Sequence, residues 1–382
     1  MVAQLDMTSL TCLPFFILAG YIMNEGGVTT RLLNFLRQLV GWFRGGLAYC
    51  TVIIAAILAA ILGSPNAVCS MLCGVLVPEM RKDGYPEEFT GSLVAASSVL
   101  GPVIPPSFQF IVFSMMTGVS IKGLFMGGVL PGVLLALAFC VIIGFMTRKK
   151  DLGKSVDKFS LRKTAVEFVK AVPALLVPIV MVGGIVGGIF TATESGAVAC
   201  LLAIIAGVIY REFDFRHMPK LLVKCGITTG SILLIVAFGG TIAWTLSMSG
   251  VPQALIAAIT GLTTNKNIII LLIMIILTIG GCFLEATAMT MVFTPIIWPL
   301  AQAIGMDGVH FGLIFSILII IGFITPPVGT LLFVTSNIAQ IELKKVCKEI
   351  WPFAIASLII IAALAYLPDL VLWLPRLCGY SG

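Results

Sequence analysis

Two proline-rich segments contain the residues with the clearest capacity for chemistry. Residues 101–106 (GPVIPP) and 324–329 (ITPPVG) each interrupt an apolar stretch. Proline lacks a backbone N–H and clashes with the preceding turn, so neither segment continues a helix. Each break exposes carbonyl oxygens from one half-helix and N–H groups from the next. Carbonyl oxygens suit a hard cation such as Na⁺, and helix N-termini suit an anion. A proline kink satisfied by neighbouring helices is the structural alternative.

Hydroxyl side chains flank both breaks and add oxygen ligands. The first break has Ser97, Ser98 and Ser107, and the second has Thr325 and Thr330. Serine and threonine in membrane helices more often bond back to their own helix, which is the alternative for each residue.

Two short polar tips separate pairs of apolar runs. Ser64 and Asn66 lie in the first tip, and Glu285 and Thr287 lie in the second. An ionisable group between apolar runs is a functional candidate, and an exposed surface carboxylate is the structural alternative for Glu285. Glu194, by contrast, is expected to cap the helix that follows it.

The composition indicates the environment in which these residues act. The chain has 382 residues, of which 59% are hydrophobic and 10% charged. Soluble domains have about 45–50% apolar and about 25% charged residues. A transmembrane helix needs about 20 apolar residues, so the sequence predicts an all-α polytopic membrane protein. Residues 268–279 are apolar except for Thr278 and show no alternation of polarity, which argues against a β-barrel.

Catalytic and cofactor motifs are absent from the sequence. It has no nucleophile–base–acid set and no phosphate-binding glycine loop. Ten cysteines are scattered, with only His217 and His310 to join them. We therefore expect neither an enzyme nor a cofactor, and no metal other than Na⁺.

Basic residues predict the orientation in the membrane. Twenty of the 23 Lys and Arg residues fall into five segments that we assign to the cytoplasm. These segments are 24–46, 81–87, 147–170, 211–226 and 338–350.

An internal repeat with an offset of 221 residues relates the two halves of the chain. The Gly and Pro coincidences are Pro78/Pro299, Gly84/Gly305, Gly91/Gly312, Gly101/Gly322, Pro105/Pro326, Pro106/Pro327 and Pro131/Pro352. In the predicted topology, loop 81–87 is cytoplasmic and its counterpart 305–309 is outside. The sequence thus predicts an inverted repeat, an architecture of many secondary transporters.

Each half is predicted to contain an amphipathic arm, an apolar hairpin and a broken helix. The arms are 28–44 and 251–263, the hairpins 46–80 and 267–304, and the broken helices 88–116 and 311–335. Hairpin arms of about 14–17 residues reach roughly 21–25 Å, less than the ~30 Å hydrocarbon core. We therefore expect both hairpins to be re-entrant.

Five segments resemble the large membrane subunit of tripartite ATP-independent periplasmic (TRAP) transporters, the DctM-like family of the ion-transporter superfamily. They are residues 14–20 (PFFILAG), 44–48 (RGGLA), 96–107 (ASSVLGPVIPPS), 188–194 (GIFTATE) and 325–329 (TPPVG). The resemblance extends from about residue 5 to residue 375.

The resemblance implies an elevator-type, Na⁺-driven carrier in the bacterial inner membrane that imports a small organic acid, such as a C4-dicarboxylate or a sialic-acid-like carboxylate. Its partners would be a small four-helix membrane subunit and a periplasmic binding protein. The implied division is 1–45 scaffold remnant and first arm, 46–146 first transport repeat, 147–250 basic linker and scaffold, 251–350 second arm and repeat, and 351–382 C-terminal helix.

The implied sites follow the breaks and tips. The Na⁺ ligands would come from Ser64, Asn66, Ser97, Ser98, Gly101, Glu285, Thr287, Thr325 and Gly329. The substrate would contact Pro105, Pro106, Ser107, Pro326, Pro327 and Thr330.

Two departures from the family pattern leave alternatives open. The sequence resembles an N-terminally shortened form, and its tips carry Pro65, Asn66 and Glu285 where other residues are usual. The alternatives are a binding-protein-independent Na⁺/carboxylate carrier of the same superfamily and an inactive truncated fragment with a structural role.

Overall fold

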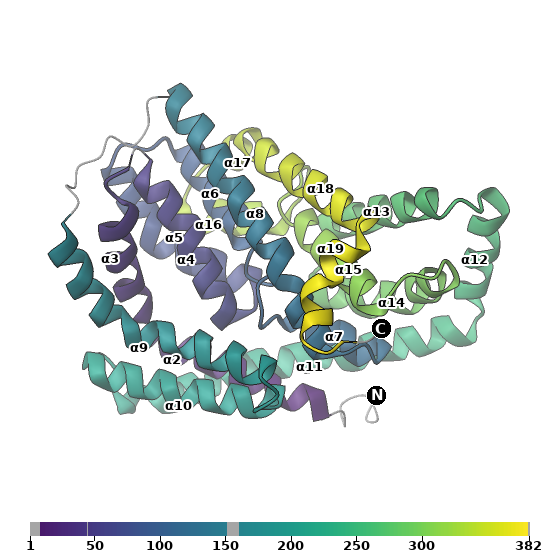
Figure 1. Ribbon diagram of the computed structural model, residues 1–382, viewed down its shortest axis with the longest axis horizontal. Helices are drawn as coiled ribbons and strands as arrows, with labels where there is room; N and C mark the ends of the chain where they lie inside the picture. The colour runs from purple at the N-terminus through teal and green to yellow at the C-terminus, as the bar shows by residue number, and fades with distance from the viewer. Residues whose placement is uncertain (1–7, 44, 151–159, 381–382) are drawn as a thin grey trace.

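The structure is a computed structural model that describes residues 8–43, 45–150 and 160–380, and every regular element in these ranges is a helix (Figure 1). The first half contains η1 Thr8–Thr11, α2 Cys12–Glu25, α3 Val28–Val40, α4 Gly46–Leu62, α5 Pro65–Lys82, α6 Glu87–Ser98, α7 Phe108–Thr117, α8 Ile121–Lys150 and α9 Leu161–Val186. The second contains α10 Ala192–Tyr210, η2 Phe215–His217, α11 Met218–Met248, α12 Val251–Leu262, α13 Lys266–Phe283, α14 Ala286–Ala303, α15 Gly308–Gly322, α16 Thr330–Ala339, α17 Leu343–Glu349, α18 Trp351–Tyr366 and α19 Pro368–Leu377.

Both predicted helix breaks are present. Residues 99–107 separate α6 from α7, and residues 323–329 separate α15 from α16. The Pro105–Pro106 and Pro326–Pro327 peptide bonds are both cis. Helix α6 ends at Ser98, four residues before Pro102, and α15 ends at Gly322, four residues before Pro326. In each case the proline lacks the N–H that would continue the helix.

The order of helices repeats along the chain. The series α3 to α7 and the series α12 to α16 each contain an arm, two hairpin helices and two half-helices. Pro65 and Ala286, which begin α5 and α14, are 221 residues apart. The arm helices α3 and α12 lie at opposite ends of the molecule (Figure 1). The opposite orientation of the two halves in a membrane stays a prediction.

Each hairpin packs against the broken helix of the other half. Helix α5 contacts α16, and α14 contacts α7. Cys69 of α5 lies 3.0 Å from the hydroxyl of Thr335 in α16. This packing of each hairpin on the other half brings both tips toward the centre of the molecule.

Further helices surround this centre. Helix α2 packs on α10 and α11, and α3 packs on α9. Helix α11 also contacts α14, so it joins the N-terminal helices to the second hairpin. The predicted scaffold includes residues 1–7, and the predicted basic linker includes 151–159; both stretches, and Arg44 of the first arm, lie outside the described residues.

Five helical stretches are long and apolar enough to cross a membrane among the described residues, or six if the bent pair α17–α18 forms one span. They are Ile121–Arg148, Leu161–Val186, Ala192–Tyr210, Phe215–Met248 and Lys266–Phe283. The last is α13, an arm of the second hairpin. Arm length therefore does not separate a re-entrant from a spanning hairpin here, and re-entrance stays a prediction.

Several boundaries differ from the predicted ones. Helix α16 continues to Ala339, where Gln340 at a φ of 54° ends it. The segment after residue 350 contains two helices, because Pro368 starts a new helix after Leu367. Helix α3 ends at Val40, before the predicted arm limit of 44.

Candidate functional site

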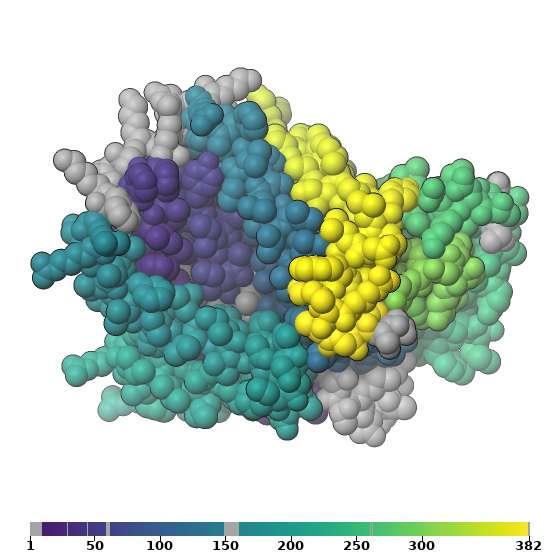
Figure 2. All heavy atoms as spheres, in the orientation of Figure 1, coloured from purple at the N-terminus to yellow at the C-terminus, as the bar shows by residue number. Residues whose placement is uncertain are grey.

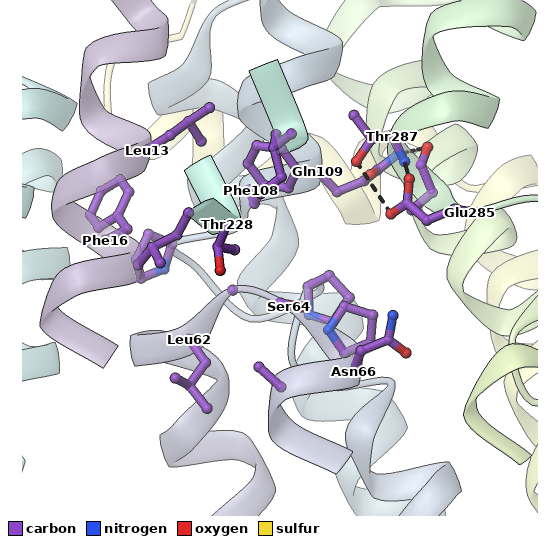
Figure 3. Close-up of a pocket in the computed structure, with 18 of the residues that line it drawn as sticks. Leu13, Phe16, Leu62, Ser64, Asn66, Phe108, Gln109, Thr228, Glu285 and Thr287 are labelled. Carbon is purple, nitrogen blue, oxygen red and sulfur yellow. Dashed lines mark hydrogen bonds between the residues drawn. The ribbon is translucent and has the colours of Figure 1, made fainter. Parts of the chain in front are cut away.

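A cavity of about 270 Å³ lies between the two tips, the first helix break, α2 and α11 (Figure 3). Its walls are mainly apolar. The polar side chains among its lining residues are Tyr21, Ser64, Asn66, Gln109, Thr228, Glu285 and Thr287. Pro102 and Pro106 of the first break also line it. The fold therefore brings both predicted tips and one predicted break to a single site.

The first tip rests directly on the first break. A Cβ on Gly63 would lie 3.3 Å from the Pro106 carbonyl oxygen and 3.3 Å from the Phe108 nitrogen. A Cβ on Gly101 would lie 3.5 Å from the Pro65 Cα atom and 3.0 Å from the Ser98 carbonyl oxygen. Gly63 has a φ of 56°, which glycine adopts at little cost. Glycine at both positions allows the backbones of the tip and the break to approach each other.

Three predicted hydroxyls bond to nearby backbone groups. Ser98 donates to the Val94 carbonyl at 2.7 Å, and Thr325 donates to the Ile321 carbonyl at 2.8 Å. Ser107 donates to the Pro102 carbonyl and accepts from the Phe110 N–H, which caps α7. All three hydroxyl protons are therefore used in bonds to nearby backbone carbonyls, which is the structural alternative to ion binding. Their oxygens retain acceptor capacity.

Other buried oxygens have no hydrogen-bond partner among the described residues. They include Ser97 Oγ, Asn66 Oδ1, Gln109 Oε1 and Thr330 Oγ1. An unsatisfied buried acceptor costs about 1–3 kcal/mol. Such a group in a native protein calls for an explanation, and a bound ion or water is one. Ser97 and Asn66 belong to the predicted Na⁺ ligands, and Thr330 belongs to the predicted substrate contacts.

The second tip is organised by Glu285. Its carboxylate accepts from the Thr287 N–H at 2.8 Å, the Ala288 N–H at 3.2 Å and the Thr287 hydroxyl at 3.3 Å. These bonds satisfy the free N–H groups at the start of α14. Glu285 is exposed and Thr287 is buried. The first tip has no equivalent, because Ser64 makes no side-chain cap to α5.

The second break lies apart from the cavity. Thr325, Pro326, Pro327, Gly329 and Thr330 are not among its lining residues, and Pro327 is exposed. The Gly329 N–H donates to the Cys282 carbonyl at 3.3 Å, so the break instead contacts the end of α13. The predicted residues of the second break are thus close to the second hairpin. They do not line the cavity that contains the two tips and the first break.

Three cavity residues were missed by the sequence analysis. Gln109 donates through Nε2 to Thr290 Oγ1 of α14, and Figure 3 shows it directed toward Thr287 and Glu285. Tyr21 of α2 and Thr228 of α11 share a hydrogen bond of 2.9 Å. An amide between phenylalanines just after a break was a usable signal for Gln109. Tyr21 lies in the short apolar helix α2 and Thr228 in the long apolar helix α11, and neither gave such a signal.

Comparison with known families identifies the architecture. The family model described as "Tripartite ATP-independent periplasmic transporter, DctM component" matches residues 1–370. The chain belongs to this family. It is accordingly a large permease subunit of TRAP type and not an enzyme, and it is a multi-pass protein of the inner membrane.

Curated relatives are similar in sequence along nearly the whole chain. A Salmonella typhimurium protein named "Uncharacterized protein YgiK" is 37% identical over 100% of this chain and 88% of its own length. The C4-dicarboxylate TRAP transporter large permease of Pseudomonas aeruginosa is 35% identical over 98% of this chain and 87% of its own. The sialic acid TRAP transporter large permease of Vibrio cholerae is 32% identical over 100% and 90%.

Solved membrane transporters share the fold at low sequence identity. The antimetabolite efflux pump MtrF of Neisseria gonorrhoeae has a TM-score of 0.64 at 12% identity, over 93% of this chain and 80% of that chain. The YdaH transporter of Alcanivorax borkumensis has a TM-score of 0.64 at 13% identity, over 100% and 88%. The TRAP permease therefore has a fold found among membrane transporters.

Proposed function

We propose that this TRAP permease couples the import of a small organic acid to a Na⁺ gradient. The substrate would be a small carboxylate such as a C4-dicarboxylate or a sialic-acid-like acid, the classes that name two of its relatives. Its partners would be a small four-helix membrane subunit and a periplasmic binding protein, as the tripartite family description suggests.

The strongest support for Na⁺ binding comes from the oxygens at the first tip and break that have no hydrogen-bond partner among the described residues. Ser97 Oγ and Asn66 Oδ1 are buried acceptors without a donor, and Gly101 holds the break against the same tip. Hard cations take oxygen ligands from side chains and carbonyls, as in other cation sites. Na⁺ between the tip and Ser97–Gly101 would satisfy these oxygens.

A second Na⁺ is proposed between the second tip and the second break. The Gly329 backbone contacts the end of α13 through the Cys282 carbonyl. Thr325 and Thr287 supply hydroxyl oxygens, and Glu285 supplies a carboxylate near the start of α14.

The cavity suits an organic anion whose charge is compensated by helix ends and Na⁺. None of the described residues that line it is Lys, Arg or His. The free N–H groups at the start of α5 and the backbone around Pro106 and Ser107 would face the carboxylate. Pro105, Pro326, Pro327 and Thr330 would then complete the substrate path in another transport state.

Na⁺ binding and substrate transport would be coupled because bound Na⁺ orders the substrate site. Bound Na⁺ fixes the tips and breaks, raises the affinity for the anion and disfavours movement of partly loaded states. In an elevator the hairpins and broken helices would move together against α2, α9, α10 and α11.

Proteoliposomes provide the test. They contain this chain, the small membrane subunit and the periplasmic binding protein loaded with radiolabelled acid. Uptake is expected under an inward Na⁺ gradient and not under a matched K⁺ gradient. Equal uptake under both gradients would reject Na⁺ coupling, and Na⁺-driven uptake without the binding protein would favour the carrier alternative.

A further inference from the structure

A second, larger cavity opens on the outside of the molecule. It is a groove of about 890 Å³ between the end of α3, helix α4 and the last turns of α8. Figure 2 shows the N-terminal helices in purple beside α8 in blue on one face of the molecule. The groove shares no lining residue with the cavity between the tips. It therefore has no part in the proposed transport site.

The wall formed by α8 is apolar and faces outward. Leu137, Val141 and Phe145 follow each other at intervals of four, and they are 58%, 58% and 73% exposed. Residues four apart lie on one face of a helix. Because α8 is long and apolar enough to span a membrane, this face meets lipid rather than water.

The opposite wall comes from α4 and from the chain after α3. Ile53 and Tyr49 of α4 and Phe43 line it. Phe43 stacks on Trp42, with ring centroids 3.9 Å apart. Aromatic side chains of this kind concentrate at the level of lipid headgroups.

Two polar groups stand at one end of the groove. Arg148 is exposed, and among the described residues it forms no ion pair and no hydrogen bond. The Tyr49 hydroxyl likewise has no hydrogen-bond partner in that part of the chain. A Cβ on Gly144 would lie 3.1 Å from that hydroxyl, so glycine gives Tyr49 room over α8, one turn before Arg148.

The dimensions match one leaflet. The wall residues extend from Leu137 to Arg148, which is about 16 Å along the axis of a helix. Half of a hydrocarbon core of about 30 Å is about 15 Å. The Arg148 end leads into the most basic segment of the chain, which the positive-inside rule assigns to the cytoplasm.

We propose that this groove binds one anionic phospholipid of the cytoplasmic leaflet. Its acyl chain lies along Leu137, Val141 and Ile53, and its phosphate accepts hydrogen bonds from Arg148 and the Tyr49 hydroxyl. A guanidinium binds phosphate in a bidentate manner, and the anionic cytoplasmic leaflet attracts basic residues at the membrane surface. The lipid thereby bridges the first hairpin and α8.

The test measures lipid binding to the purified full chain. Delipidated protein is titrated with phosphatidylglycerol and, separately, phosphatidylcholine, and bound lipid is counted by native mass spectrometry. We expect one tightly bound phosphatidylglycerol per chain and at least about tenfold weaker phosphatidylcholine binding.

Three variants test the contributions of single groove residues to lipid binding, and one control variant changes a residue outside the groove. Arg148→Gln is expected to weaken phosphatidylglycerol binding about tenfold and to reduce the preference over phosphatidylcholine. Tyr49→Phe should weaken it less, and Gly144→Leu should block binding of both lipids by filling the groove. Arg216→Gln changes an exposed arginine outside the groove and is expected to bind like the unaltered chain.

Equal losses in Arg148→Gln and Arg216→Gln, or unaltered binding in Gly144→Leu, would overturn the proposal. Release of the bound phosphatidylglycerol on addition of the small membrane subunit would also overturn it, because the groove would then be a subunit interface. If Arg148→Gln fails to fold, Tyr49→Phe and Gly144→Leu decide the question. None of these readouts depends on transport, so they are independent of Na⁺ coupling.

Discussion

The side chain of Gln109 donates a hydrogen bond to Thr290, which ties the first broken helix to the second hairpin. Thr290 in turn donates to the Ala286 carbonyl at 2.8 Å, at the second tip. The contact between Cys69 and Thr335 joins the first hairpin to the second broken helix in the corresponding way, and Cys69 and Thr290 are 221 residues apart. The two contacts therefore link each hairpin to the broken helix of the other half.

Gln109→Leu and Thr290→Val are predicted to be coupled. Each removes one partner of a buried bond, whose net value is about 1 kcal/mol. The double variant should therefore be less destabilised than the sum of the two single variants, by about 0.5–1.5 kcal/mol. Reversible unfolding of the four proteins in detergent measures this difference. Strict additivity would mean that the contact makes no energetic contribution.

Ser97→Ala is predicted to affect Na⁺ dependence and not stability. The Ser97 hydroxyl has no partner among the described residues, so its removal leaves no new unsatisfied group. The Na⁺ concentration for half-maximal uptake should rise about tenfold, because one ligand is worth roughly 1–2 kcal/mol.

Ser92→Ala is the matched control for Ser97. Ser92 is buried in the same helix and donates to the Phe89 carbonyl at 3.0 Å. Its loss should lower stability by about 1 kcal/mol and leave the Na⁺ response unchanged. The reverse pattern, with an altered Na⁺ response only in Ser92→Ala, would move the ion away from the first tip.

Glu285→Gln and Glu285→Ala distinguish a cap from an ion ligand. Glutamine keeps an oxygen for the Thr287 and Ala288 N–H groups but removes the charge. Alanine removes the cap as well and should cost about 1 kcal/mol of stability. We expect both variants to weaken Na⁺ dependence of uptake. Normal Na⁺ dependence in Glu285→Gln would assign this carboxylate to helix capping alone.

Gly322→Ala is predicted to be severely destabilising. A Cβ at this position would lie 2.5 Å from the backbone carbonyl carbon of Gly281, and backbone cannot move as a side chain can. The expected loss is at least about 1–3 kcal/mol, with poor yield of folded protein. Gly74→Ala is the control, because nothing lies within 4 Å of its added Cβ, and a helical Gly to Ala change is neutral or stabilising. Equal melting temperatures for the two variants would contradict the close approach of α13 and α15.

The ion pairs of Glu79 predict a pH dependence of stability. The Lys82 ammonium and the Arg37 guanidinium lower the pKa of Glu79 below its ordinary value. The stabilisation is present above the unfolded-state pKa of about 4.3 and is lost as the pH falls through the native value. Arg37→Gln should therefore lower the melting temperature more at pH 7 than at pH 4. An equal effect at both pH values would show that the Arg37 side chain stabilises by packing.

The breaks and the tips were predictable from the sequence because they depend on local chemistry. Pro105, Pro106, Pro326 and Pro327 prevent a continuous helix wherever they lie. Glu194 follows the same logic: it accepts from the Thr191 N–H at 2.8 Å and completes the expected cap of α10.

The composition of the cavity was not predictable from local sequence. Tyr21, Gln109 and Thr228 come together only because α2, α7 and α11 pack around the tips, and helix packing is not encoded in a single segment. Conversely, the second break has the same sequence signature as the first, yet it contacts the end of α13 outside this cavity. The periodicity of apolar residues also gave no indication of the groove along α8.

Binding of Na⁺ by the purified chain shows whether the first tip and break hold the coupling ion. The melting temperature of the full chain in detergent is measured against NaCl, with KCl keeping the ionic strength constant, because a ligand that binds only the folded state stabilises it. A Na⁺ site at the first tip predicts a saturable rise of the melting temperature with Na⁺ that is absent with K⁺ and shifted to higher concentration in Ser97→Ala. A melting temperature that responds identically to the two salts, in both proteins, would contradict it.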